Sequence, residues 1–173
     1  MAVAAVSGSF LVSVWTISAG DAMKAISYEF LDWVRATVVG GAAGVLGPEL
    51  VFDEREKGFA QHIQKSVNSG LGCCVVVSLA ELRQDGNGPD DTQYRVEVNV
   101  SVLRNAGLAT EVDSVLLAEH LFRLFAGAVF EPMPCGLPVT VKAGSLTHQV
   151  TGLKFIHTFE VSYLTTIISE NYV

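Results

Sequence analysis

Four histidines are the side chains of this sequence best suited to bind a metal ion or to transfer a proton: His62, His120, His148 and His157. Two ligands for one metal usually come from spacings such as His-x-His, His-Glu-x-x-His or Cys-x-x-Cys, and the sequence contains none of these. His120 lies within a predicted helix, and His157 lies on the mainly apolar face of a predicted strand. We therefore expect histidines of the core or the surface, with no metal site and no catalytic role.

The three cysteines could in principle supply a nucleophile. Cys73 and Cys74 open an apolar run, whereas a reactive thiolate needs a helix start or a nearby cation. We expect both to be buried as small hydrophobic residues. Cys135 lies in a Pro- and Gly-rich loop, where we expect it to be exposed. An odd count with two adjacent members does not make a disulfide framework, and a reducing, cytoplasmic setting fits best.

Two glycine-rich stretches could bind phosphate or calcium. "GGAAG" at 40–44 lacks the Gly-Lys-Ser/Thr ending of a P-loop, and "DGNGPDD" at 85–91 lacks the spaced ligands and final Glu of an EF-hand. Ordinary turn chemistry explains the second stretch. We expect solvated charges at Asp85, Asp90, Asp91, Glu111 and Asp113. The sequence thus predicts no catalytic, cofactor or metal residues, and no cofactor.

Composition restricts the class of protein. Half of the 173 residues are hydrophobic and 17% are charged, which implies either a membrane segment or apolar surface buried against partners. The uncharged N-terminal stretch is interrupted by serines and has no basic flank, so we expect no membrane or export role. We expect a strand at about 9–17 and burial in an oligomer. A net charge of -7 without basic clusters disfavours nucleic-acid binding.

The first half of the chain predicts two helices and a short strand. Apolar residues at three- and four-residue spacing predict a helix over 18–41, begun by Ser18 or Asp21 and ended by Gly40 and Gly41. The apolar set is Met23, Ile26, Phe30, Trp33, Val34 and Val38. A short strand is expected within 49–54. A second helix within 55–70 would carry Phe59, Ile63 and Val67 on one stripe.

The centre of the chain predicts a long antiparallel hairpin followed by a helix. Residues 73–82 are apolar at nearly every position, as in a strand buried on both faces, and 83–91 is a predicted turn. Strict alternation then gives the next strand one valine face, made by Val96, Val98, Val100 and Val102. Thr110 or Asp113 would begin a helix packed on that face through Val112, Leu116, Leu121, Phe122, Phe125 and Val129.

The last segments predict a Pro-rich loop at 131–138, then strands at 139–144 and 153–167. On the final strand Phe155, His157, Phe159, Val161, Tyr163 and Thr165 would share one face. Such an order indicates an α+β fold in which helices pack on one face of an antiparallel β-sheet. We expect one domain over 1–173, with residues 1–18 as an extended arm or strand.

With its elements in this order, the chain resembles the tail terminator, or tail completion, proteins of long-tailed bacteriophages. The likeness covers about Asp21 to Ile168 and rests on "GCCVVVSLAELRQDG", "TQYRVEVNVSVLRN", "EVDSVLLAEHLFRLFAG" and "LKFIHTFEVSYLTTI". It implies a tail-terminator-like α+β fold and a non-enzymatic virion protein. It further implies a ring, usually a hexamer, that caps the tail tube and joins the tail to the head or neck, after assembly in the host cytoplasm.

Two other functions remain open from the sequence. One is a small α+β enzyme or ligand-binding protein whose pocket is assembled from dispersed residues. The other is a different head-tail connector or neck protein, which the sequence does not separate from a terminator. Partners expected from the resemblance are other copies of the chain, a tail tube protein and a neck protein, with no membrane and no specific nucleic acid.

Overall fold

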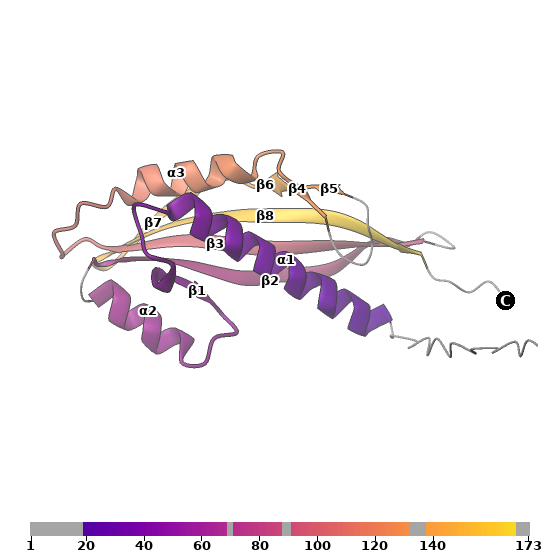
Figure 1. Ribbon diagram of the computed structural model, residues 1–173, viewed down its shortest axis with the longest axis horizontal. Helices are drawn as coiled ribbons and strands as arrows, with labels where there is room; N and C mark the ends of the chain where they lie inside the picture. The colour runs from indigo at the N-terminus through magenta and orange to yellow at the C-terminus, as the bar shows by residue number, and fades with distance from the viewer. Residues whose placement is uncertain (1–18, 69–70, 88–90, 132–137, 169–173) are drawn as a thin grey trace, which may run out of the picture.

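The computed structural model describes residues 19–68, 71–87, 91–131 and 138–168 (Figure 1). Its helices are α1 (Ala19–Ala42), α2 (Phe59–Asn68) and α3 (Ser114–Phe125), with a 3-10 turn at Pro48–Leu50. The long strands are β2 (Cys73–Asn87), β3 (Asp91–Asn105) and β8 (Lys154–Ile168). The short strands are β1 (Val51–Asp53), β4 (Val129–Phe130), β5 (Val139–Thr140), β6 (Lys142–Ala143) and β7 (Thr147–Thr151).

The main sheet has the strand order β1-β2-β3-β8-β6, and β7 also pairs with β8. All of its pairings are antiparallel except β1 with β2, which is parallel. β4 and β5 form a separate antiparallel pair. The structure confirms the predicted α+β class and adds a parallel strand at one edge. None of the described helices has the length and apolar character needed to cross a membrane.

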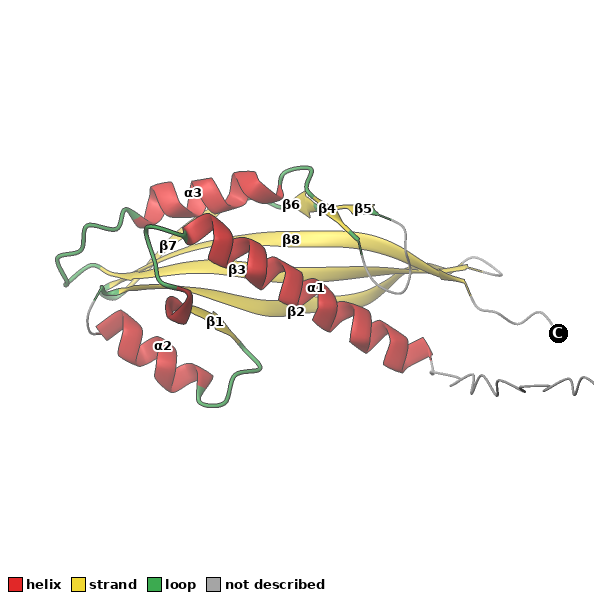
Figure 2. Ribbon diagram, viewed as in Figure 1, coloured by secondary structure: helices red, strands yellow, loops and turns green. Residues whose placement is uncertain are grey.

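The predicted valine face is the centre of the core. Val96, Val98, Val100 and Val102 are completely buried. Across the β3–β8 pairing Val98 faces Val161 and Val100 faces Phe159, so apolar side chains of neighbouring strands lie side by side. Figure 2 shows α1 and α3 lying along the sheet, and both helices contribute to this core cluster. The strict period-two pattern therefore predicted both the strand and its covered face.

The predicted apolar stripe of α1 faces the core. Phe30 and Val34 are fully buried, and the Phe30 ring lies 4.4 Å from the Tyr163 ring of β8, centroid to centroid. The predicted end at Gly40 and Gly41 is wrong, since α1 continues to Ala42. A β-carbon at Gly41 would collide with the Leu124 side chain, so this glycine allows close packing of α1 on α3. Gly44 ends the helix instead, with φ +86.

The second helix covers the start of the opposite face of the sheet. Val67 of α2 packs with Phe52 and Cys74, and Phe59 and Ile63 join this small cluster. Successive strand side chains alternate between faces, so Cys74 lies opposite to the side chains that contact α1. The prediction that 73–82 is buried on both faces holds only for its beginning, because residues 80–82 are exposed. The exposure concerns both faces, because Leu82 pairs with Val96 of the valine face and Glu81 pairs with Glu97 of the opposite face.

Asp113 begins α3, as one of the two predicted caps, and accepts hydrogen bonds from the backbone N–H groups of Val115 and Leu116. Two residues that were predicted to lie on the buried face of this helix do not lie there. Leu116 is 63% exposed and Val129 lies beyond the helix, 53% exposed. With the helix starting after Asp113, the inward positions are Ser114, Leu117, Ala118, Leu121 and Phe125.

Three further predicted segments differ from the structure. Residues 83–87 belong to β2 rather than to a turn, with irregular pairing between Gln84 and Gly86. The strand expected at 139–144 is divided into β5, which pairs with β4, and β6, which pairs with β8. The hairpin partner of β8 is β7, which was not predicted, and Gly152 turns between them with φ +59. The helix cap Ser18 and most of the 131–138 loop lie outside the described residues.

Candidate functional site

The structure brings two of the four histidines together. His148 of β7 pairs with His157 of β8, and their Nδ1 atoms are 2.7 Å apart. His62 lies on the exposed side of α2, with its ring 6.1 Å from the Phe52 ring. His120 is exposed on α3. Within the described residues no group of three His, Cys, Asp or Glu side chains could hold a metal ion.

The histidine pair extends into the core through Ser114. The Ser114 hydroxyl lies 3.0 Å from Nε2 of His157, so both ring nitrogens of His157 have a polar partner. Ser114 is 2% exposed and His157 is 4% exposed, whereas His148 is exposed on the sheet edge. A chain of polar contacts therefore leads from Ser114, the first residue of α3, through His157 to His148 at the surface.

Serine next to histidine is also the arrangement of an activated nucleophile, which needs room for a substrate. Here Ser114 and His157 are both buried where α3 meets β8, so this network links two elements rather than presenting a reactive oxygen. Burial lowers the pKa of His157, and the neighbouring His148 lowers that pKa further. Asp113, which would favour the charged imidazole, opposes these effects. The network thus favours an uncharged His157.

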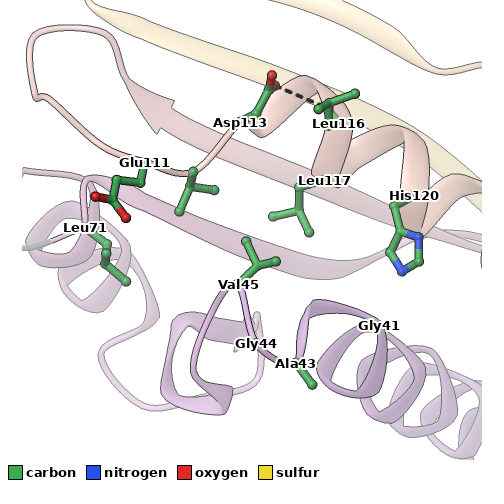
Figure 3. Close-up of a pocket in the computed structure, with 11 residues that line it drawn as sticks. Gly41, Ala43, Gly44, Val45, Leu71, Glu111, Asp113, Leu116, Leu117 and His120 are labelled. Carbon is green, nitrogen blue, oxygen red and sulfur yellow. Dashed lines mark hydrogen bonds between the residues drawn. The ribbon is translucent and has the colours of Figure 1, made fainter.

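A cleft lies between the end of α1 and the start of α3 (Figure 3), with a volume of about 630 Å³. Val45, Leu71 and Leu116 give it apolar walls, and each of these side chains is substantially exposed. Figure 3 shows Glu111 and His120 toward opposite ends of the row of lining residues. The cleft could hold an apolar group, such as a side chain of a partner or a small ligand.

The face of the sheet opposite to the valine face carries charge. Glu97 of β3 pairs with Glu81 of β2, and Arg83 lies 3.5 Å from Glu97 and 3.8 Å from Glu81. Glu97 is 8% exposed. Its burial raises the pKa of the carboxyl group, and Glu160 of β8 raises it further, while Arg83 opposes the shift. Arg95 and Lys142 lie on the same face by register, so its charge is mixed, and the sequence analysis did not single out the burial of Glu97.

Asp53, which the sequence analysis did not select, is a buried carboxylate at the end of β1. The Arg55 Nε lies 3.0 Å from each carboxylate oxygen, and the Arg55 backbone N–H donates to Oδ1 at 2.9 Å. Burial alone would raise the pKa of Asp53, but these hydrogen bonds outweigh it and hold the pKa below its ordinary value. The same guanidinium also binds Asp32 of α1. The cluster fixes the β1–α2 connection against α1.

The cysteines agree with the predicted burial where they are described. Cys73 and Cys74 are fully buried. Burial raises the pKa of the Cys73 thiol to about 11 and that of Cys74 to about 12. Neither is a thiolate at neutral pH. Cys135 lies outside the described residues.

The acidic residues expected to be solvated have different positions. Glu111 is exposed, as predicted, and Asp113 is exposed but also caps α3. Asp85 lies in β2 and Asp91 begins β3, while Asp90 lies outside the described residues. The "GGAAG" stretch forms the end of α1 and the turn after it.

The fold therefore defines a small α+β protein with a mixed sheet and two surface features, a cleft and a charged face. No protein-family model matches this chain, and no curated protein matches it. A solved structure that is similar to it shares 18% sequence identity, with a TM-score of 0.46, over 89% of this chain and 100% of the other. A likeness of that extent identifies neither a family nor a function.

Proposed function

We propose that this protein is a non-enzymatic structural subunit of a bacteriophage tail, acting as a tail terminator. Copies of the chain form a ring, most simply a hexamer, that caps the tail tube and joins it to the head or neck. The proposal starts from the resemblance in the order and type of the elements, from the β2–β3 hairpin to β8. The chain would then be located in the virion, after assembly in the host cytoplasm.

The observation that carries this proposal is the uncovered edge of the long sheet. The outermost strand, β1, pairs only with Val75–Val77 of the fifteen-residue strand β2. Beyond it, residues 80–82 of β2 are exposed, and no described strand pairs with their outer side. Open edges invite pairing with other chains, and a head-to-tail ring with a closing rotation removes them all. In a ring, a neighbouring subunit would cover this edge.

Charge is compatible with a ring through which DNA passes. The chain has a net charge of -7. Like charge repels phosphate, so an acidic bore would let DNA slide without being gripped. The position of an engineered cross-link between neighbouring subunits would reveal which residues line the bore.

The direct test is assembly with a tail tube. Purified protein should form rings, seen by electron microscopy and by mass in solution, either alone or when mixed with the tube protein encoded beside it. Tail-tube and tape-measure genes next to this gene would support the proposal, and a metabolic operon would contradict it. A ring that binds the neck but never the tube end would favour the connector alternative.

The cleft favours one second candidate, a ligand-binding protein. Its volume of about 630 Å³ is within the range of small-molecule sites, and its walls are mainly apolar with a few polar groups. A raised melting temperature with an apolar small molecule, abolished by Leu116→Glu, would favour this reading. Leu164→Glu is a matched control, because Leu164 is also an exposed leucine but lies on β8, away from the cleft lining.

A further inference from the structure

The turn between β7 and β8, called here the hairpin tip (residues 150–154), exposes apolar side chains. Its two turn residues are Gly152, with φ +59, and Leu153. Leu153 is 70% exposed, and Val150 just before the turn is 69% exposed. With Leu116 of the cleft, at 63%, they are the three most exposed large hydrophobic residues of the described chain. Exposed apolar residues that lie close together often mark an interaction site.

The end of β3 holds the hairpin tip in place. The Ala106 N–H donates a hydrogen bond of 2.7 Å to the carbonyl of Leu153, and Lys154 pairs with Asn105, so the β3–β8 ladder continues up to the turn. None of the described tip residues lines the cleft of the same chain. A tip that is already ordered loses little conformational entropy when it binds, so it is suited to enter a concave surface.

The cleft between α1 and α3 is a concave surface of the same apolar character. Its walls come from Val45 and Leu71 on one side and from Leu116 on the other (Figure 3). These three side chains are between 46% and 63% exposed. The cleft volume of about 630 Å³ is large enough for two aliphatic side chains. Filling it with the tip of another copy would remove apolar surface of both copies from water.

Charge favours the same match. The ionisable residues that line the cleft are Glu111, Asp113 and His120, with no lysine or arginine among them. The hairpin at 147–154 carries Lys154 and no acidic residue. Within the described residues neither Lys154 nor Glu111 belongs to an ion pair. An acidic cleft and a basic tip attract each other, whereas two clefts or two tips repel.

From these observations we propose that the hairpin tip of one copy of this chain docks into the cleft of a second copy. Val150 and Leu153 then contact the apolar walls, and Lys154 lies near Glu111. The proposal deepens the ring proposed above and rests on self-association of the chain. Because tip and cleft are different surfaces, each copy gives one tip and receives one, and such a head-to-tail contact can close into a ring.

Reversal of the two charges tests the contact in the full chain. Lys154→Glu and Glu111→Lys each bring like charges together, so each should raise the dissociation constant of self-association about fivefold at low salt. A protein with both changes again has opposite charges at the contact, and its dissociation constant should return to within about twofold of the original value. Light scattering over a concentration series measures self-association, and circular dichroism checks the folding of each variant. If the two effects simply add in the double variant, the two residues do not meet and the proposal fails.

The apolar part of the contact is tested by Leu153→Asp. This change places a charge in an apolar cleft and should raise the dissociation constant at least about tenfold. Leu164→Asp is the matched control, because Leu164 is 43% exposed on β8 and lies outside both the tip and the cleft lining. It adds the same charge and should leave the dissociation constant unchanged. An equal rise in both variants would trace the effect to added negative charge and would overturn the proposal.

Disulfide trapping identifies the two surfaces that meet. Leu153→Cys and Val45→Cys are prepared separately in a Cys135→Ser background, mixed and mildly oxidised. A linked heterodimer should exceed both linked homodimers, and it is intermolecular by construction. Leu164→Cys in place of Val45→Cys should not link to Leu153→Cys. A Leu153→Cys homodimer as the main product would show that tips meet tips, which the proposal does not allow.

Failure of this contact and failure of the ring give different results. Self-association that neither Leu153→Asp nor the charge reversals weaken would refute the docking of the tip while leaving the ring intact. A full chain that never self-associates, alone or with the tail tube protein, would refute both.

Discussion

Ser114→Ala is the most informative single change, because it removes one partner from the Ser114–His157–His148 network without altering the volume of the core by much. The hydroxyl contact to Nε2 of His157 is 3.0 Å long, and both residues are almost completely buried. Water therefore does not replace the lost partner, and one ring nitrogen of His157 remains unsatisfied in the core. His148 would still be available to Nδ1.

The expected effect follows from that burial. Leaving a buried polar atom without its partner costs about 1–3 kcal/mol of the free energy of unfolding. In a domain of this size each kcal/mol lowers the melting temperature by about 2–4 °C. His157→Leu should cost a similar amount, since it leaves the Ser114 hydroxyl alone. The double variant should lose less than the sum of the two, because no unpaired group remains.

The network also predicts a pH dependence. The pKa of His157 is lowered in the folded protein, mainly by burial, whereas an unfolded histidine has a pKa of about 6.5. The unfolded chain then binds a proton more readily, so the contribution of His157 to stability is fully present above about pH 6.5 and is lost as the pH falls through its folded pKa. Stability should therefore fall between neutral and mildly acidic pH, and this part of the fall should be absent in His157→Leu.

Urea denaturation followed by circular dichroism, at neutral and mildly acidic pH, measures all of these quantities. Ser145→Ala, at an exposed serine, is the control and should change the free energy of unfolding by less than about 0.5 kcal/mol. If Ser114→Ala behaves like the control, or if the two core variants are strictly additive, the Ser114–His157 hydrogen bond contributes nothing and the reasoning fails.

Three further changes test the local structure. Cys73 and Cys74 should resist a thiol reagent at neutral pH until the protein is denatured, since burial raises both pKa values; rapid labelling of either would contradict their burial. Asp113→Ala should cost about 1 kcal/mol of stability by chemical denaturation, because it removes the cap of α3, whereas Asp113→Asn should cost less. Gly72→Ala should lower the melting temperature, because Gly72 has φ +61 and a β-carbon would lie 3.1 Å from Leu108; an unchanged melting temperature would contradict that strain.

Regular apolar periodicity made much of the fold predictable. The valines of β3 and the apolar stripe of α1 each pack on one surface, so their apolar residues recur with the period of a strand or a helix. That period can be recognised in the sequence. β7 escaped prediction because all five of its residues are exposed, so "THQVT" contains no apolar alternation. The end of α1 was misplaced because Gly41 is required by the contact with Leu124, which is distant in sequence.

The candidate sites were less predictable, because each is made by residues far apart in the chain. His148 and His157 meet only through the register of the β7–β8 hairpin, and Ser114 reaches them from α3, forty-three positions before His157. The cleft likewise combines Val45, Leu71 and Leu116 from three separate segments. These residues are not grouped in the sequence, so no motif spacing reveals that they meet. Asp113 was predictable because a helix cap depends only on neighbouring residues.

The pairing of β3 with β8 has a consequence for the newly made chain. β3 finds its first partner, β2, immediately before it in sequence, but β8 pairs along the other side of β3 only after the helix and loops between them have been made. Ribosomes add about 5–20 residues per second, so the roughly fifty residues between the two strands take several seconds to appear. During that interval the edge of β3 that pairs with β8 has no native neighbour, and the row of valines on its face lacks the apolar side chains of β8. Chaperones that shield such a row from aggregation would therefore act while the chain is still attached to the ribosome, and slowing synthesis after Asn105 should reduce the yield of correctly folded protein.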